Sequence, residues 1–99
     1  MTHNYFVYIT TNFNKTVLYT GVTNDLARRI EEHKSSSLEN KNNFTAKYKA
    51  FYLIYWERFQ WIQHAIAREK EIKGWSRMKK LELIKSFNPE LRFLNDEIE

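Results

Sequence analysis

The pattern of apolar and polar positions predicts two neighbouring strands near the start of the chain. Residues 4–10 are β-branched or aromatic almost throughout, which is typical of a strand that is covered on both faces. The polar residues 11–16 indicate a turn, and strand character resumes over residues 17–22. We therefore expect an antiparallel hairpin.

The simplest register of this hairpin brings two tyrosines together. If Thr10 pairs with Val17, Tyr8 lies directly opposite Tyr19. Directly opposite residues point to the same face of a sheet, with Cβ atoms about 5 Å apart. The two tyrosine side chains are then expected to interact.

Capping residues and helical spacing predict a first helix that ends near Lys34. Three polar residues of the kind that precede helices are followed by an inward stripe at i, i+4 and i+7, namely Thr23, Asn24 and Asp25 and then Leu26, Ile30 and His33. At about 100° per residue, Arg29 lies beside this stripe, whereas Arg28 points to solvent. The two arginines are therefore not equivalent.

The rest of the chain predicts a polar loop, a third strand and two more helices. The loop covers residues 35–49, and the apolar and aromatic residues 51–57 favour a strand. Helical spacing covers residues 60–73 and then, after a capping Ser76, continues to about Phe87. The order β-β-α-β-α-α predicts a single α+β domain, in which helices flank a three-stranded antiparallel sheet.

Composition and charge narrow the functional classes. The 99 residues suit one domain and include no cysteine, which excludes a disulfide framework and a thiolate zinc site. No stretch approaches eighteen consecutive apolar residues and the N-terminus lacks a signal-peptide pattern, so we expect a soluble, cytoplasmic protein without a membrane partner. The net charge is +4, and residues 1–85 hold fifteen of the sixteen Lys and Arg but eight of the twelve Asp and Glu. Such a body could attract nucleic acid, although many small proteins are basic only for solubility.

Two charged residues fall on inward helix faces, and each has two interpretations. Glu69 lies about 20° from the centre of the apolar stripe of its helix. We favour an ion pair with Lys73, one turn later, over a divalent metal as the partner of Glu69. Arg29 either extends past the apolar stripe to water, which is the default, or grips a phosphate with its planar guanidinium.

Several aromatic and imidazole side chains are also candidates, each with a structural explanation beside the functional one. His33 alone is more often a hydrogen-bonded histidine at the core edge than a ligand, and His3 and His64 offer no spacing for a histidine zinc site. Phe44 and Tyr48 could stack on bases or pack across the loop. The three tryptophans are expected in the core or between helices. The basic residues of the last two helices usually form a solvated face, but they could follow a phosphate backbone.

Several short motifs occur in order along the chain. They are Phe6-Val7-Tyr8 and Tyr19-Thr20-Gly21 in the strands, Arg29 and His33 in the first helix, Glu69 in the second helix and Asn88-Pro89 after the third. Together they resemble the GIY-YIG nuclease family, in particular its small stand-alone bacterial members related to the catalytic module of excision-repair and homing endonucleases. The resemblance covers nearly the whole chain. Phe6 stands in place of a glycine, and Val22 stands where some members carry a lysine.

The resemblance implies hydrolysis of a phosphodiester bond with one divalent cation. Glu69 would hold Mg²⁺ or Mn²⁺, and Arg29 would neutralise charge on the phosphoryl oxygens. Either Tyr8 or Tyr19 would activate the attacking water as general base, and the resemblance does not choose between them. His33 would assist proton transfer.

The resemblance also implies that Asn88 orients the site.

The resemblance implies a nucleic-acid partner and leaves alternatives open. The expected substrate is DNA, with RNA as an alternative, and the expected setting is repair or recombination. The rival functions are a nucleic-acid-binding module that keeps the fold without cleavage and a protein-interaction domain that uses the surplus of aromatic side chains. The oligomeric state stays open.

Overall fold

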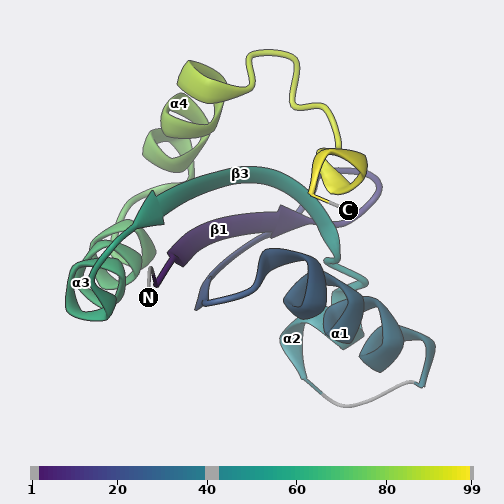
Figure 1. The fold of residues 1–99 in the computed structure, drawn as a ribbon. Helices are drawn as coiled ribbons and strands as arrows, with labels where there is room; N and C mark the ends of the chain where they lie inside the picture. Colours follow the sequence, from purple (N-terminus) through teal and green to yellow (C-terminus); the bar gives the residue numbers. More distant parts are fainter. Residues whose placement is uncertain (1–2, 40–42, 99) are drawn as a thin grey trace.

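Three strands form one antiparallel sheet with the order β2-β1-β3, and helices cover both of its faces (Figure 1). The computed structural model describes residues 3–39 and 43–98. The elements along the chain are β1 (Tyr5–Thr11), β2 (Leu18–Thr23), α1 (Leu26–Leu38), α2 (Phe44–Tyr48), β3 (Tyr52–Phe59), α3 (Ile62–Lys73), α4 (Arg77–Phe87) and the 3₁₀ helix η1 (Asn95–Glu97). The predicted fold class and element order are confirmed, with α2 as an additional short helix.

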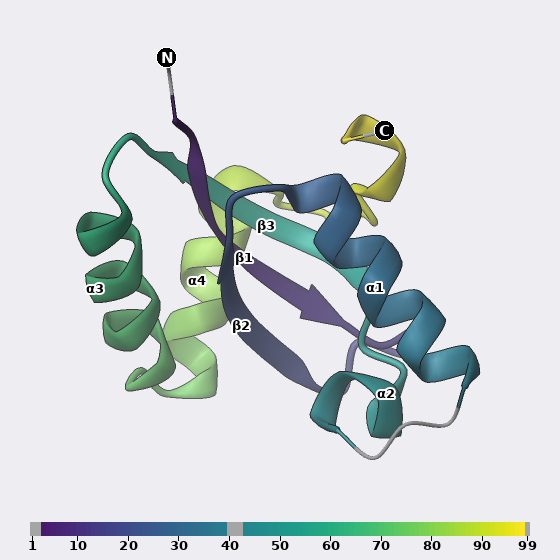
Figure 2. The ribbon, with the colours of Figure 1, turned by 60° about the horizontal axis from the view of Figure 1, so that its bottom comes forward.

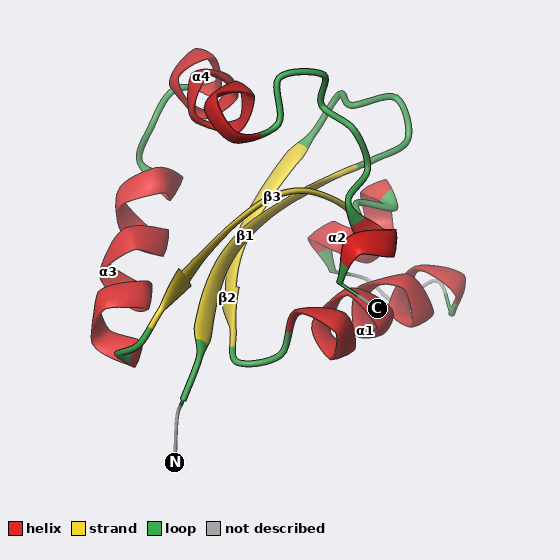
Figure 3. Ribbon diagram, turned by 45° about the horizontal axis from the view of Figure 1, so that its top comes forward, coloured by secondary structure: helices red, strands yellow, loops and turns green. Residues whose placement is uncertain are grey.

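The central strand β1 is apolar throughout because each of its faces meets a different layer of helices. Val7 and Ile9 face α3 and α4, where they form a core with Ala65 and Ile72, among others. Tyr8, between them, faces α1. Figure 3 shows α3 and α4 on one side of the sheet and α1 and α2 on the other. Consecutive strand residues point to opposite faces, so the Tyr8 side chain is separated from the α3–α4 core by the sheet.

The predicted hairpin register is wrong by two residues. Thr10 pairs with Tyr19 and not with Val17, and Tyr8 pairs with Gly21. The loop is longer than expected because the Asn12 side chain organises it: Asn12 Oδ1 accepts hydrogen bonds from the backbone amides of residues 16 and 17, at 2.8 and 3.2 Å. A shift by an even number of residues keeps every side chain on its face, so Tyr8 and Tyr19 become diagonal neighbours on one face.

The prediction of a loop over residues 35–49 is wrong at both ends of this segment, where the structure has helices. Residues 40–42 lie outside the described residues. Helix α1 continues past Lys34 to Leu38, and the other end of the segment forms α2. Asn43 caps α2 by accepting a hydrogen bond from the backbone amide of Ala46 at 2.9 Å. The extra turn of α1 buries Ser37, whose hydroxyl donates to the Ala46 carbonyl at 3.5 Å. These contacts fasten α2 to α1.

The last two long helices, α3 and α4, follow the predicted signals more closely. Ser76 caps α4, as expected, by accepting a hydrogen bond from the backbone amide of Lys79. Trp56 and Trp75 pack at the core, but Trp61 is 54% exposed, so the prediction that all three tryptophans are packed is wrong for Trp61. Within the described residues, no helix is both long and apolar enough to cross a membrane.

The C-terminal segment returns to the outer edge of β3. The backbone amide of Leu94 donates to the Leu53 carbonyl at 2.7 Å, and Asn95 Oδ1 accepts from the Leu53 amide at 2.9 Å. Asn95 Nδ2 in turn donates to the Phe51 carbonyl at 3.0 Å. Leu94 is thereby buried against the same core as Tyr8.

Candidate functional site

The Tyr8 ring extends over the neighbouring strand β2 at Gly21, the one residue of that strand without a side chain. A Cβ atom built on Gly21 would lie 2.4 Å from Tyr8 Oη and 2.5 Å from Cζ, far inside van der Waals contact. The hydroxyl therefore rests against the Gly21 backbone, and only 1% of Tyr8 is exposed. Because the motif residues Tyr8 and Gly21 pair across the two strands, glycine at position 21 is what lets this hydroxyl reach β2.

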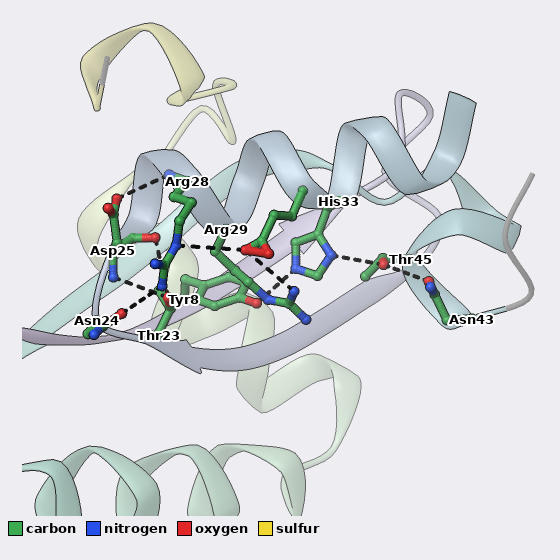
Figure 4. A network of polar contacts seen from close by, with 10 residues as sticks. Tyr8, Thr23, Asn24, Asp25, Arg28, Arg29, His33, Asn43 and Thr45 are labelled. Atoms are coloured by element: carbon green, nitrogen blue, oxygen red, sulfur yellow. Dashed lines mark hydrogen bonds and ion pairs between the residues drawn. The ribbon is translucent and has the colours of Figure 1, made fainter. Parts of the chain in front are cut away.

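His33 contacts the Tyr8 hydroxyl from α1. Its Nε2 lies 2.9 Å from Tyr8 Oη, and its Nδ1 lies 2.9 Å from Thr45 Oγ1 on α2 (Figure 4). His33 is 3% exposed, so the prediction of a hydrogen-bonded histidine at the core edge is confirmed. Burial, together with repulsion from Arg29, lowers the His33 pKa to about 4. The imidazole is therefore neutral at pH 7.

Arg29 is the second side chain from α1 beside the tyrosine, and it carries a positive charge. Figure 4 shows its guanidinium at the end of the Tyr8 ring, on the same side as His33. Burial raises the Tyr8 pKa to about 12, and the nearby charges of Tyr19 and Glu69 act in the same direction, whereas Arg29 lowers it. The phenol thus stays protonated at neutral pH in the free protein.

The two consecutive arginines differ as the helical spacing predicts. The Arg29 side chain is 39% exposed and the Arg28 side chain 63%. Arg28 donates a hydrogen bond to Asn24 Oδ1 at 3.0 Å, away from the tyrosines. Glu32 lies 3.9 Å from each guanidinium, a long distance that leaves Arg29 weakly paired. Arg29 therefore keeps a partly exposed cationic group beside Tyr8.

A small pocket opens beside these groups on the α1 face of β2. Its volume is about 160 Å³, and its lining residues are Tyr19, Arg29, His33, Ser36, Asn43, Phe44 and Thr45. The Tyr19 ring lies 6.3 Å from the Tyr8 ring and 5.5 Å from the His33 ring. Phe44 stacks on Tyr19 at 5.9 Å, and Tyr48 follows at 4.8 Å from Phe44, with each about two-fifths exposed. The predicted packing of Phe44 and Tyr48 is confirmed, and because both rings also face solvent, stacking on bases stays a prediction.

Glu69 approaches the same strand from the opposite side of the sheet. Figure 2 shows β2 running between α3 on one side and α1 with α2 on the other. The Glu69 side chain is 16% exposed, and its Oε1 lies 3.4 Å from Lys73 Nζ, so the predicted ion pair is confirmed. Its carboxylate is near enough to raise the Tyr8 pKa. The structure thus brings Tyr8, Tyr19, Arg29 and His33 together, and Glu69 lies on α3, the helix that contacts β2 from the other side.

The donor set around Glu69 limits the metals that it could hold. Among the described residues, no group of three or more His, Cys, Asp or Glu side chains could enclose an ion. This excludes a zinc-like cage within the described residues. One carboxylate suits Mg²⁺ or Mn²⁺, which keep several waters and take further oxygens from a bound phosphate. The residues present fit such an ion.

Asn88 lies apart from this cluster. It ends α4, on the far side of the sheet from Tyr8, and it is 4% exposed. Asn88 Nδ2 donates to the carbonyls of Ile54 at 3.0 Å and Arg92 at 2.8 Å, and Asn88 Oδ1 accepts from the Arg92 amide at 3.1 Å. These bonds fasten the chain after α4 to β3. A role of Asn88 in orienting the site stays a prediction.

Four basic side chains of the last two helices are engaged in the fold. Arg68 pairs with Glu57 at 3.1 Å and also contacts Glu71. Arg77 donates to the carbonyls of residues 15 and 16, both at 3.1 Å, and thereby holds the β1–β2 loop. Lys73 pairs with Glu69, and Lys79 lies over the Trp75 ring. The basic stretch is therefore only partly a solvated face.

Sequence patterns missed two contributors to this site. Gly21 was recognised as part of a motif, but its steric role depends on the true register. Thr45 was placed in a loop, although it is buried in α2 and contacts His33. The signal that could have located it is Asn43, an N-cap residue type directly before the Phe44–Tyr48 segment.

Comparison with known proteins identifies the family. The model of the GIY-YIG catalytic domain matches residues 4–82. A UPF0213 protein of Syntrophus aciditrophicus is 39% identical over 90 residues, covering 91% of this chain and 98% of the relative, and one of Staphylococcus aureus is 35% identical over 82 residues, covering 83% and 95%. The solution structure of the UPF0213 protein BH0048 from Bacillus halodurans superposes with a TM-score of 0.56 at 31% identity, covering 88% of each chain. The chain belongs to the GIY-YIG family of nucleases, within its group of small UPF0213 proteins.

Proposed function

We propose that this protein is a metal-dependent endonuclease that hydrolyses phosphodiester bonds in DNA. The observation that carries the proposal is the convergence of Tyr8, Tyr19, Arg29 and His33 on one side of β2, with Glu69 on the helix that contacts β2 from the other side. These residues come from four motifs, in β1, β2, α1 and α3, and these motifs meet only through the fold. Perturbed pKa values at Tyr8 and His33 support a functional site.

Arg29 is the group that binds and neutralises a phosphate. Its guanidinium is partly exposed, only weakly paired with Glu32 and next to the pocket that Tyr19 lines. Arginine can bind two phosphate oxygens in parallel, which fixes the orientation of the scissile group. Charge that develops on the phosphoryl oxygens in the transition state is stabilised by the same side chain.

Tyr8 and His33 form the proton-accepting pair. A phenol with a pKa of about 12 is almost never ionised at neutral pH, so Tyr8 acts as a relay: it accepts a proton from water while it passes its own proton to His33. The phenol then stays neutral throughout. A bound phosphate would offset the Arg29 charge, which is one of the causes of the low His33 pKa, and so would strengthen His33 as a base. Tyr19 lines the pocket and positions the phosphate or the water.

Glu69 holds the divalent cation. When bound, Mg²⁺ or Mn²⁺ would act as a Lewis acid on the phosphate and lower the pKa of coordinated water. Glu69 is mostly buried and must exchange Lys73 for the cation, so Lys73 competes with the metal. The basic body of the chain supports a polyanionic substrate, and we expect DNA in a repair or recombination setting, in a reducing, cytoplasmic compartment.

Nicking of supercoiled plasmid with and without Mg²⁺ or Mn²⁺ tests the proposal. Glu69→Gln and Arg29→Ala should each lower the nicking rate by about a hundredfold or more, since each removes charge stabilisation in the transition state. Two matched controls should stay within about threefold of wild type: Arg28→Ala removes the neighbouring arginine, and Glu71→Gln removes a carboxylate that pairs with Arg68.

Equal cutting by wild type and Glu69→Gln would refute the assignment and indicate a contaminating nuclease. DNA binding without metal-dependent cutting would instead support the rival function, a non-catalytic binding module on this fold. Repeating the assay with an RNA of the same sequence separates the two possible substrates.

A further inference from the structure

A continuous chain of hydrogen bonds links the candidate site to the start of α2. It runs from Tyr8 Oη to His33 Nε2 at 2.9 Å, from His33 Nδ1 to Thr45 Oγ1 at 2.9 Å, and from Thr45 Oγ1 to Asn43 Oδ1 at 3.0 Å (Figure 4). Tyr8, His33 and Thr45 are each exposed by 4% or less, so water has little access to the inner links. Only Asn43, at the outer end, is exposed.

The outer end of this chain fixes the direction of the bonds that Thr45 makes. The Asn43 side-chain atom that meets Thr45 also caps α2, where it accepts a hydrogen bond from the Ala46 backbone amide at 2.9 Å. An atom that accepts from a backbone amide is the carbonyl oxygen and cannot donate. Thr45 must therefore donate its single hydroxyl proton to Asn43.

The same reasoning continues inward to the tyrosine. Because the Thr45 proton is committed to Asn43, the contact with His33 requires Nδ1 to carry a proton and donate it to Thr45. His33 is buried and lies beside the Arg29 cation, which favours the neutral imidazole, so its Nε2 carries no proton. Nε2 can then only accept, and its partner is the Tyr8 hydroxyl.

We propose that Thr45 and Asn43 are positioning residues that hold His33 in its Nδ1-protonated tautomer and so make it a proton acceptor for Tyr8. The inference rests on the proposed nuclease function for its catalytic meaning, but the tautomer itself is a property of the free protein. Helix α2 thereby does more than cover the sheet. Its N-cap residue Asn43 helps to determine which atom donates in the hydrogen bond between Tyr8 and His33. A hydrogen-bond partner that fixes an imidazole tautomer in this way is a general device in histidine sites.

Nitrogen-15 NMR of the imidazole rings in the free, full-length protein tests the tautomer directly, with His33→Gln used to assign the signal. Wild type should show protonated Nδ1 and bare Nε2 at pH 7. Thr45→Val removes the acceptor while it keeps the side-chain shape, and it should shift His33 toward the Nε2-protonated form, in which Tyr8 can no longer donate to it. Thr45→Ser should restore the wild-type pattern. Ser37→Ala, which removes another buried hydroxyl between α1 and α2, should leave the tautomer unchanged.

Plasmid nicking by the same variants connects the tautomer to function. Thr45→Val should lose about a hundredfold in rate, the usual contribution of one general base, while Thr45→Ser and Ser37→Ala stay within a few-fold of wild type. If wild type shows the Nε2-protonated form, or if Thr45→Val keeps both the wild-type tautomer and rate, the inference is overturned while the nuclease proposal stands. If the tautomer changes as expected but wild type cuts no substrate, the proposed function fails and the arrangement at His33 is confirmed.

Discussion

Substituting Gly21 with alanine perturbs the contact on which the position of the Tyr8 hydroxyl depends. The new Cβ would lie 2.4 Å from Tyr8 Oη and 2.9 Å from Cε1, so either the ring or strand β2 must move. The ring is almost fully buried among residues from α1, β3 and the C-terminal segment, which leaves it little room. Overpacking of this kind costs about 1–3 kcal/mol. If the ring turns away, the lost hydrogen bond to His33 costs a further 1–3 kcal/mol, approximately.

A gain partly offsets these costs, because replacing glycine by alanine reduces the freedom of the unfolded chain by about 0.4–1 kcal/mol. The expected net loss of stability is therefore about 3 kcal/mol. Equilibrium unfolding in urea, followed by tryptophan fluorescence, measures it. The other glycine of the chain is a matched control: a Cβ on Gly74 meets no atom closer than 3.5 Å, so Gly74→Ala should be neutral or slightly stabilising.

A double-mutant cycle separates this clash from any intrinsic preference of the strand. In a Tyr8→Leu background, which lacks Cε1, Cζ and Oη, Gly21→Ala should cost less than half of what it costs in wild type. The reasoning would be refuted if Gly21→Ala were as stable as wild type, or if its cost were undiminished beside the shorter side chain of the Tyr8→Leu background. Under conditions in which Gly21→Ala and wild type are both folded, Gly21→Ala should nick more slowly, because its displaced Tyr8 hydroxyl no longer meets His33.

Three further predictions concern other parts of the molecule. Asn88→Ala removes one buried and two partly buried hydrogen bonds and should lower the free energy of unfolding in urea by about 2–4 kcal/mol, whereas Asn14→Ala in the exposed turn should be neutral. The pKa of His33 is about 4 in the folded protein, so as the pH falls the unfolded chain binds the extra proton first. Stability should therefore fall by at most about 3 kcal/mol as the pH drops from about 6.5 to 4. A His33→Gln variant whose stability had the same pH profile as wild type would contradict this. Lys73→Met removes the competitor for Glu69 and should lower the Mn²⁺ dissociation constant measured by calorimetry about twofold, and unchanged or weaker binding would argue against Glu69 as the ligand.

The sequence predicted the parts of the fold that depend on local signals. Strand composition, the Ser76 cap and the placement of Arg29 beside an inward stripe each depend on a few neighbouring residues, and each is confirmed. Periodicity also put Glu69 at a mostly buried position with Lys73 as its partner. Local patterns were sufficient because helix geometry alone fixes which residues share a face.

Features that depend on side chains far apart in sequence were not predicted. The hairpin register follows from the hydrogen bonds of Asn12 in the loop and from the fit of Tyr8 over Gly21. The strand preferences of single residue types contain neither of these contacts. Helix α2 is only five residues long and gains its stability from contacts with α1, so its sequence resembled a loop. The link from Thr45 to His33 needed both of those elements in place.

The return of the C-terminal segment to β3 bears on how this protein behaves at high concentration. An open strand edge exposes unpaired amides and carbonyls that another chain can extend into an aggregate. Here the Leu94 backbone amide and the Asn95 side-chain amide pair with residues 51 and 53, in place of a fourth strand. Because the Asn95 side chain cannot itself pair with a further strand, this end of the sheet is closed to strand addition. A chain shortened before Leu94 would expose unpaired backbone groups of β3 and should aggregate more readily.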